Sequence, residues 1–265
     1  MCLIALALQQ HPEYPLILIA NRDEFYHRPT ASAAFWQDQP EIFAGRDLEA
    51  GGTWLGINRS GRLAALTNVR DGNDNFQGAR SRGLLPLDFL KSDLSAQSFM
   101  QKLQLQGHIY SGFNLLTLDL KGLLEHSENC GFHFNNKTHK ANPLSPGINT
   151  LSNGSLNTPW PKTRALHAAL ANHLTDNHEQ NLDSQQLLDL LTNTQQYPDK
   201  QLPNTAVSLA WERVLSPLFI HSKGYGTRAS TAVLLNRKGE ILFREIGFDL
   251  NKQISSETEI SFMIT

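Results

Sequence analysis

Cysteine and charge are both sparse in this chain of 265 residues. Its two cysteines, Cys2 and Cys130, exclude a disulfide framework as the basis of stability, and this usage predicts a reducing, cytoplasmic compartment. Charged residues make up 18% of the chain, and the formal net charge is −2 at pH 7. Nucleic-acid-binding proteins usually carry clustered basic residues, so we expect no nucleic-acid partner.

The chain also lacks long apolar runs. The run at residues 2–8 is too short to cross a bilayer, and no basic leader of the signal-peptide kind precedes it, so we expect no membrane span. Repeats and low-complexity linkers are absent as well. A hydrophobic share of 40% is ordinary for a globular protein, and residues 1–265 are therefore expected to form a single domain.

What the chain does have is a series of short apolar runs separated by turn residues. Runs at 2–8 and 16–21 predict one hairpin, and runs at 53–58 and 63–68 predict a second. Residues 26–52 and 71–81 are rich in turn-forming and polar residues, which predicts long loops. Further strands are expected at 113–119, 123–128, 148–153, 218–220, 232–235, 241–246 and 260–264.

Apolar residues with helical spacing occur at 84–90, 95–105, 160–174 and 184–191. Hairpins, helices and strands thus follow one another in blocks and do not alternate regularly. This order favours an α+β fold with two mainly antiparallel sheets over a parallel α/β fold. Two sheets packed face to face, with helices outside, would use all of the expected elements.

Cys2 is the first candidate for chemistry. Methionine before a small residue is commonly removed, and removal of Met1 would give Cys2 a free α-amine beside its thiol. An α-amine has an ordinary pKa of about 7.7–8.0, so near neutral pH it can take the thiol proton and act as the base. The alternative is that Cys2 is a small buried hydrophobic residue, as free cysteines often are.

Four polar residues, Asn21-Arg22-Asp23-Glu24, close the second expected strand. If the first two strands pair, this cluster lies near Cys2. A carboxylate such as that of Asp23 can there bind an α-ammonium group, and a guanidinium such as that of Arg22 can lower the pKa of a thiol. The alternative is a capped turn with solvated charges.

Asn68 and Asn153 each end an expected strand, and Arg228 lies shortly before another. Asparagine amides at strand ends can donate hydrogen bonds to a developing oxyanion, although asparagine is also common in turns. Arg228 can pair with Asp23, bind an anionic ligand or form a structural ion pair.

An ordered set of short motifs in this chain resembles the NRDE family, also called the transport and Golgi organisation 2 family. The motifs are spread over nearly the whole chain, and their order makes the resemblance specific. They are Met1-Cys2, Ala20-Asn21-Arg22-Asp23-Glu24, Gly51-Gly52-Thr53-Trp54-Leu55-Gly56, Leu66-Thr67-Asn68-Val69-Arg70, Ser81-Arg82-Gly83-Leu84, Leu151-Ser152-Asn153 and Tyr225-Gly226-Thr227-Arg228.

That family in turn resembles N-terminal nucleophile hydrolases, which implies a four-layer αββα sandwich in which an N-terminal cysteine attacks an amide. Carried over by position, the catalytic candidates are Cys2 as nucleophile, Asp23 as acid, Arg22, Asn68, Asn153 and Arg228. Candidate substrate-binding residues in the matched motifs are Asn21, Glu24, Trp54 and Arg70. The hydrolases carry Arg-Asn-x-Asp, whereas Arg22 directly precedes the acid here, and we expect this shift to reverse its face on the strand.

Two functions follow as hypotheses. The first is an N-terminal cysteine amidohydrolase or acyltransferase that acts on a small acyl-amide or acyl-thioester and requires no cofactor. The alternative, implied by the family resemblance, is a protein that binds or carries haem, or an acyl-CoA or lipid-linked ligand, on the same fold. Ten histidines and Cys2 are available as haem ligands, but there is no Cys-x-x-Cys-His motif, and the cysteine spacing predicts no metal site of the zinc type.

Overall fold

The computed structural model describes residues 2–74 and 76–265, and their strands form two antiparallel sheets. Met1, which we expect to be removed, lies outside the described residues. The first sheet has six strands in the order β10-β1-β2-β11-β12-β13. In that order they span Gly147–Leu151, Cys2–Leu8, Leu16–Phe25, Tyr225–Leu235, Glu240–Phe248 and Ile254–Met263.

The second sheet has seven strands, and each pairs with its neighbour in the chain, from β3 to β9. They span Thr30–Trp36, Gln39–Asp47, Leu55–Asn58, Arg62–Asn68, Phe113–Asp119, Gly131–Asn135 and Lys140–Pro143. The first sheet, by contrast, combines strands from both ends of the chain. Strand β2 lies at its centre between β1 and β11, which carries the Asn21–Glu24 cluster into the middle of the sheet.

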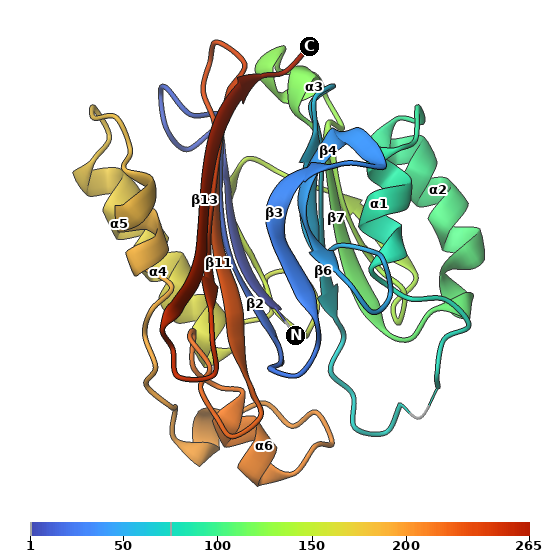
Figure 1. The fold of residues 1–265 in the computed structure, drawn as a ribbon, viewed down its shortest axis with the longest axis vertical. Helices are drawn as coiled ribbons and strands as arrows, with labels where there is room; N and C mark the ends of the chain where they lie inside the picture. The colour runs from blue at the N-terminus through green and yellow to red at the C-terminus, as the bar shows by residue number, and fades with distance from the viewer. Residues whose placement is uncertain (1, 75) are drawn as a thin grey trace.

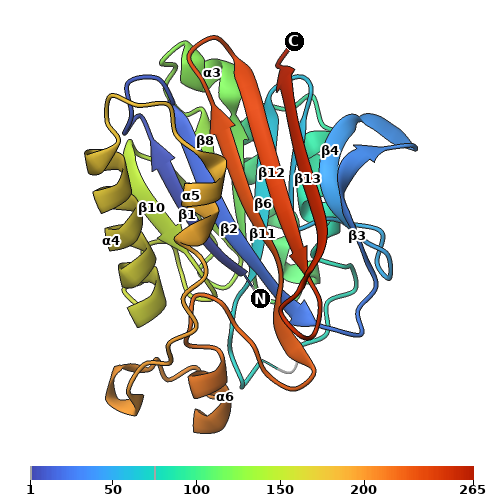
Figure 2. The same cartoon turned by 60° about the vertical axis from the view of Figure 1, so that its left-hand side comes forward.

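Helices cover the outer faces of both sheets, so the molecule has four layers in the order αββα (Figure 1). On the first sheet lie α4 (Pro161–Asp176) and α5 (Ser184–Asp189), which Figure 2 shows from the front. On the second lie α1 (Leu84–Leu90) and α2 (Ala96–Gln106). Shorter helices are α3 (Leu120–Leu124), α6 (Leu209–Val214) and two 3-10 turns, Gly107–Ile109 and Asp199–Gln201. The predicted α+β sandwich is confirmed.

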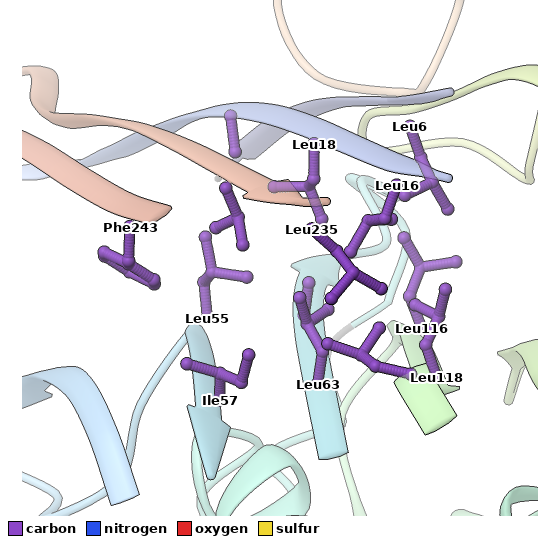
Figure 3. Close-up of a cluster of buried hydrophobic side chains, with 14 of the residues drawn as sticks. Leu6, Leu16, Leu18, Leu55, Ile57, Leu63, Leu116, Leu118, Leu235 and Phe243 are labelled. Carbon is purple, nitrogen blue, oxygen red and sulfur yellow. The ribbon is translucent and has the colours of Figure 1, made fainter. Parts of the chain in front are cut away.

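Aliphatic side chains on the two inner faces hold the sheets together. Figure 3 shows side chains of the first sheet pointing at those of the second, among them Leu6, Leu16, Leu18, Leu63, Leu116 and Leu118. Burial of one such side chain contributes roughly 1.5–3 kcal/mol. The alternate residues of β1 and β2, such as Leu3 and Ile17, pack instead against the helix layer. Both faces of β1 and β2 are therefore buried, which explains their continuous apolar sequences.

Most of the expected elements are confirmed, including the hairpins β1–β2 and β5–β6 and the helices α1, α2, α4 and α5. Within the described part of the chain, no helix has the length and apolar character needed to span a bilayer. The predicted loop at 26–52 was wrong, because it contains β3 and β4. Strand β3 is an edge strand with several solvent-facing residues, so it lacks the apolar run that marked the other strands.

Two predicted strands were also wrong. Residues 123–128 overlap the helix α3, whose first turn is capped by the carboxylate of Asp119 through the N–H groups of Lys121 and Gly122. The neighbour of β7 is instead β8. Residues 218–220 form no strand, although their apolar side chains are buried.

Candidate active site

A cavity of about 130 Å³ opens where β1 begins and β2 ends. Both sheets and the segment before α1 supply its lining, which consists of Cys2, Arg22, Asp23, Glu24, Arg28, Asp47, Thr53, Trp54, Leu66, Asn68, Ser81, Arg82 and Gly83. Of the predicted site residues, the cavity brings together Cys2, Arg22, Asp23, Glu24, Trp54 and Asn68. The other four, Asn21, Arg70, Asn153 and Arg228, lie outside its lining.

Cys2 is directly opposite Arg22 in the β1–β2 ladder. Because cross-strand partners share a face of the sheet, both side chains lie on the inner face. The expected reversal of Arg22 was wrong: the shift relative to the hydrolases is two positions, and side chains two apart lie on the same face. Cys2 is buried, and burial raises the pKa of its thiol, which the charge of Arg22 opposes. The thiol therefore needs a neighbouring base to ionise near neutral pH.

Arg22 is held beside the thiol by three contacts. Its guanidinium carbon lies 4.2 Å from the ring centroid of Trp54, and Nη1 donates to Thr30 Oγ1 at 3.1 Å. Nη2 lies 3.5 Å from Asp47 Oδ2. The position of Trp54 itself requires glycine at residue 45, because a Cβ there would lie 2.3 Å from the indole ring. The second sheet thus fixes the cation that faces the nucleophile.

Asp23 projects from the opposite face of β2, toward the helix layer. Its Oδ1 accepts a hydrogen bond from Thr227 Oγ1 at 2.7 Å, and Lys162, in the first turn of α4, is buried nearby and donates to the Leu215 carbonyl at 3.0 Å. Burial raises the pKa of Asp23, whereas the charge of Lys162 and the Thr227 hydrogen bond lower it. Burial also lowers the pKa of Lys162 to about 8, against the opposing effect of Asp23. Two opposite charges thus lie behind the backbone of the nucleophile's strand pair.

The two asparagines expected at an oxyanion site take different positions. Asn68 lines the cavity, and within residues 2–74 and 76–265 its side-chain amide has no hydrogen-bond partner, so it is available to a ligand. Asn153 is buried, and its Nδ2 donates to the Asn68 carbonyl at 2.9 Å. The adjacent Ser152 donates to the Cys2 carbonyl at 3.1 Å. Asn153 therefore positions Asn68 relative to Cys2, and its amide nitrogen is bound to the Asn68 carbonyl in this structure.

Asn21, an expected substrate-binding residue, lies outside the lining of the cavity. It is fully buried on the outer face of β2, where Nδ2 donates to the carbonyls of Leu191 at 3.1 Å and Leu218 at 2.9 Å. Its Oδ1 accepts a hydrogen bond from Ser230 Oγ at 2.6 Å. All three contacts join β2 to distant segments, so Asn21 stabilises the fold.

Arg228 and Arg70 also lie away from the thiol. A register shift in β11 sets Arg228 out of the ladder, and its Nη1 donates to the carbonyls of Phe25 and Tyr26 at 3.1 Å each and of Arg28 at 3.2 Å. Arg70 forms a buried ion pair with Glu212 at 3.3 Å and is stacked over Trp160. Both arginines hold loops at this end of the sandwich and do not line the cavity.

The cavity also contains residues that were not predicted as site residues. Arg82 is one of these residues, and its place in the motif Ser81-Arg82-Gly83-Leu84 is a sequence signal for a site residue. Arg28 and Asp47 form a 2.6 Å ion pair at the cavity and come from the segment predicted as a loop. Lys162 carries no local signal, because its importance depends on burial beside a residue far away in the sequence.

For haem, the alternative ligand, the cavity at Cys2 offers a volume of about 130 Å³ and three arginines in its lining. Among the described residues, none of the histidines lines it. Residues 2–74 and 76–265 contain no group of three or more His, Cys, Asp or Glu side chains that could hold a metal ion.

Comparison with known proteins agrees with this architecture. A family model described as Transport and Golgi organisation 2 matches residues 1–249. The chain is 36% identical over 261 residues to the Transport and Golgi organization protein 2 homolog of Bos taurus, with 92% of each chain covered. It is 27% identical over 270 residues to Transport and Golgi organization protein 2 of Drosophila melanogaster, with 92% of this chain and 91% of that one covered.

Among solved structures, a C2A variant of the conjugated bile acid hydrolase from Clostridium perfringens covers all of the chain with a TM-score of 0.51. At 9% identity this likeness concerns the fold alone, and it supports the N-terminal nucleophile hydrolase-like sandwich. The family resemblance inferred from the motifs is confirmed, and this chain belongs to the transport and Golgi organisation 2 family.

Proposed function

We propose that this chain is an N-terminal cysteine amidohydrolase or acyltransferase that acts on a small acyl-amide or acyl-thioester. The observation that carries the proposal is the meeting of the Cys2 thiol, the Arg22 guanidinium and the Asn68 amide in one cavity. A buried thiol beside a fixed cation and an available amide donor is the arrangement that nucleophilic acyl transfer requires. Asp23 lines the same cavity, where its carboxylate is suited to hold the α-ammonium group of a processed Cys2.

The first half-reaction acylates Cys2. With Met1 removed, the α-amine of Cys2 takes the thiol proton, and the sulfur forms a bond to the substrate carbonyl carbon. The electron pair of the C=O bond moves to the oxygen, and Asn68 donates a hydrogen bond to the resulting oxyanion. The oxyanion then collapses, the C–N bond breaks, and the α-ammonium returns its proton to the departing amine. An acyl thioester on Cys2 remains.

The second half-reaction removes the acyl group. The α-amine takes a proton from water as the water oxygen attacks the thioester carbon. The intermediate then collapses, the C–S bond breaks, and the α-ammonium gives its proton to the departing sulfur, which releases the carboxylic acid and restores the thiol and the amine. An acceptor amine in place of water gives acyl transfer. In both halves the carboxylate of Asp23 stabilises the ammonium form of the α-amine, and Arg22 favours the thiolate.

The test uses the chain's second cysteine as the matched control. The processed protein, Cys2→Ala and Cys130→Ala are incubated with a panel of acyl-amides and acyl-thioesters, and product release is followed. We expect a loss of about 10³-fold or more in Cys2→Ala, because the nucleophile is absent. Cys130 directly precedes β8 and does not line the cavity, so Cys130→Ala keeps the wild-type rate. Equal rates in Cys2→Ala and wild type, or no turnover of any substrate, would overturn the proposal.

We also infer a cytoplasmic location. Cys2 and Cys130 are both free thiols. Unpaired cysteines are typical of proteins in reducing compartments.

A further inference from the structure

Arg82 is fixed at the wall of the cavity by its backbone. The Gly83 carbonyl accepts a hydrogen bond from Thr53 N–H at 2.9 Å, which ties the segment to the start of β5. The two segments approach so closely that a Cβ on Gly52 would lie 2.3 Å from the Gly83 backbone. Any side chain at residue 52 would therefore push Arg82 away from the cavity.

The guanidinium of Arg82 is also fixed. Its Nη1 donates to the Gly112 carbonyl at 3.1 Å, and the same carbonyl accepts the Val69 N–H at 2.9 Å. Val69 directly follows Asn68, so one carbonyl links the guanidinium to the strand end that carries the available amide. The Gly112 carbonyl thus fixes the guanidinium of Arg82 relative to the strand end that carries Asn68.

The three arginines of the cavity differ in their partners. Arg22 and Arg28 both pair with Asp47, at 3.5 and 2.6 Å. Arg82 forms no ion pair with any acidic residue in the described part of the chain. Glu24, across the cavity, favours the charged form of Arg82 only at longer range. The lining carries three arginines and three carboxylates, those of Asp23, Glu24 and Asp47, and Arg82 is the arginine among them that has no ion-pair partner in the described part of the chain.

A buried arginine without an ion-pair partner is suited to bind an anion. Burial lowers the pKa of Arg82, which means that its charge is poorly solvated. A poorly solvated guanidinium gains more from a carboxylate than an exposed one does, and its remaining N–H groups can bind two oxygens at once. Hydrogen bonds to charged groups contribute about 1.5–3 kcal/mol, which corresponds to roughly 10–100-fold in affinity.

We propose that Arg82 is a specificity-determining residue that binds an anionic group, of the carboxylate type, on the substrate of the Cys2 site. This inference rests on the proposed function and narrows its substrate class to amides or thioesters that carry an anion within the cavity, on either the acyl or the leaving group. Arg82, Asn68 and Arg22 line the same cavity as Cys2, so a substrate anion bound by Arg82 would lie near the nucleophile.

The test compares substrates that differ only in one charge. N-octanoylglycine and N-octanoylglycinamide place the anion or its neutral equivalent on the leaving group. The anilides of succinic and butyric acid do so on the acyl group. In at least one pair we expect wild type to favour the anionic member by about 10–100-fold in kcat/KM. In Arg82→Gln that ratio falls to about one, and Arg82→Lys restores part of it.

Arg80→Gln is the matched control, because Arg80 lies two residues away and pairs at 3.4 Å with Asp88 at the protein surface, outside the cavity. This variant loses the same formal charge and keeps the wild-type ratio. A ratio near one for both pairs in wild type, or an equal loss of the ratio in Arg80→Gln and Arg82→Gln, would overturn the proposal.

Failure of the proposed function can be told apart from failure of this inference. The dissociation constants of the same four compounds are measured by calorimetry on Cys2→Ala, which cannot form an acyl-enzyme. Preferential binding of an anionic member that disappears in Cys2→Ala/Arg82→Gln supports the inference even where no turnover occurs. Equal binding of both members of each pair contradicts it even where Cys2 is catalytic.

Discussion

The two faces of β2 near its end have opposite characters. On the inner face Arg22 borders an open cavity and shares it with the buried thiol of Cys2. On the outer face Asn21 lies under the helix layer, where hydrogen bonds to Leu218 and Ser230 hold its amide. Alternation along one strand thus places Arg22, which is available to a ligand, on one side and Asn21, which is bound within the fold, on the other.

Mutations on the two faces should therefore affect different properties, activity on the inner face and stability on the outer face. Changes at the cavity should lower activity while the protein remains stable, because their partners include the ligand. Changes on the outer face should lower stability first, because each leaves buried polar groups without partners. Three predictions test this separation, and they follow in order of the expected effect.

The largest effect is expected at Asn68, whose amide lines the cavity. Asn68→Ala should lower turnover by about 10²–10³-fold, as loss of one oxyanion donor typically does, with little change in the free energy of unfolding. The control Asn251→Ala removes an exposed asparagine and should change neither quantity. Steady-state kinetics and urea unfolding measure both. If the loss of activity in Asn68→Ala is explained by a loss of stability, Asn68 stabilises the fold and does not bind the oxyanion.

The next effect is expected at Asn21. Asn21→Ala leaves the carbonyls of Leu191 and Leu218 and the hydroxyl of Ser230 without their partner in the protein interior. At about 1–3 kcal/mol for each of these three buried groups, we expect the free energy of unfolding to fall by about 3 kcal/mol or more. Chemical denaturation against the same Asn251→Ala control measures this. If Asn21→Ala has wild-type stability but strongly reduced activity, Asn21 takes part in substrate binding and this prediction is wrong.

The smallest effect concerns Lys162 and depends on pH. Its pKa in the folded protein is about 8, below the ordinary value of 10.5. Between about pH 8 and pH 10.5 the unfolded chain binds the lysine proton and the folded chain does not. The free energy of unfolding therefore increases with pH over this range. At pH 9.5, which is about 1.5 units above the pKa in the folded protein, we expect this increase to reach about 2 kcal/mol.

Lys162→Met should abolish that rise, since methionine does not titrate. Lys238→Met, at an exposed lysine, should retain it. Unfolding free energies of the three proteins at pH 7.5, 8.5 and 9.5 give the comparison. Parallel curves for wild type and Lys162→Met would show that the ammonium of Lys162 is solvated and does not lie beside Asp23 as a buried charge.

Local sequence was sufficient for the framework of the molecule. Continuous apolar runs predicted β1 and β2 because both of their faces are buried, and the turn between them made them neighbours. The same pairing brought Cys2 and Arg22 together. Local sequence was insufficient for β3, which is partly exposed, and for α3, where one capping carboxylate decides between strand and helix.

Sequence alone could not distinguish polar side chains that are bound within the fold from those that are available to a ligand. Asn21 and Asn68 are the same residue type, and in the sequence each ends an apolar run. They differ because Leu191 and Leu218, some 170 and 197 residues from Asn21, supply its acceptors. Arg228 was misplaced for a similar reason, since a register shift in β11 turns it toward backbone carbonyls. Such distinctions depend on tertiary packing that no motif records.

The most direct test of a Cys2 nucleophile is the mass of the N-terminal peptide after brief reaction with an acyl-amide and acid quenching. The proposal predicts a peptide that begins at Cys2, without Met1, and that carries one acyl group on Cys2 removable by hydroxylamine. An active protein that retains Met1, or an acyl group found on another residue such as Cys130, would contradict it.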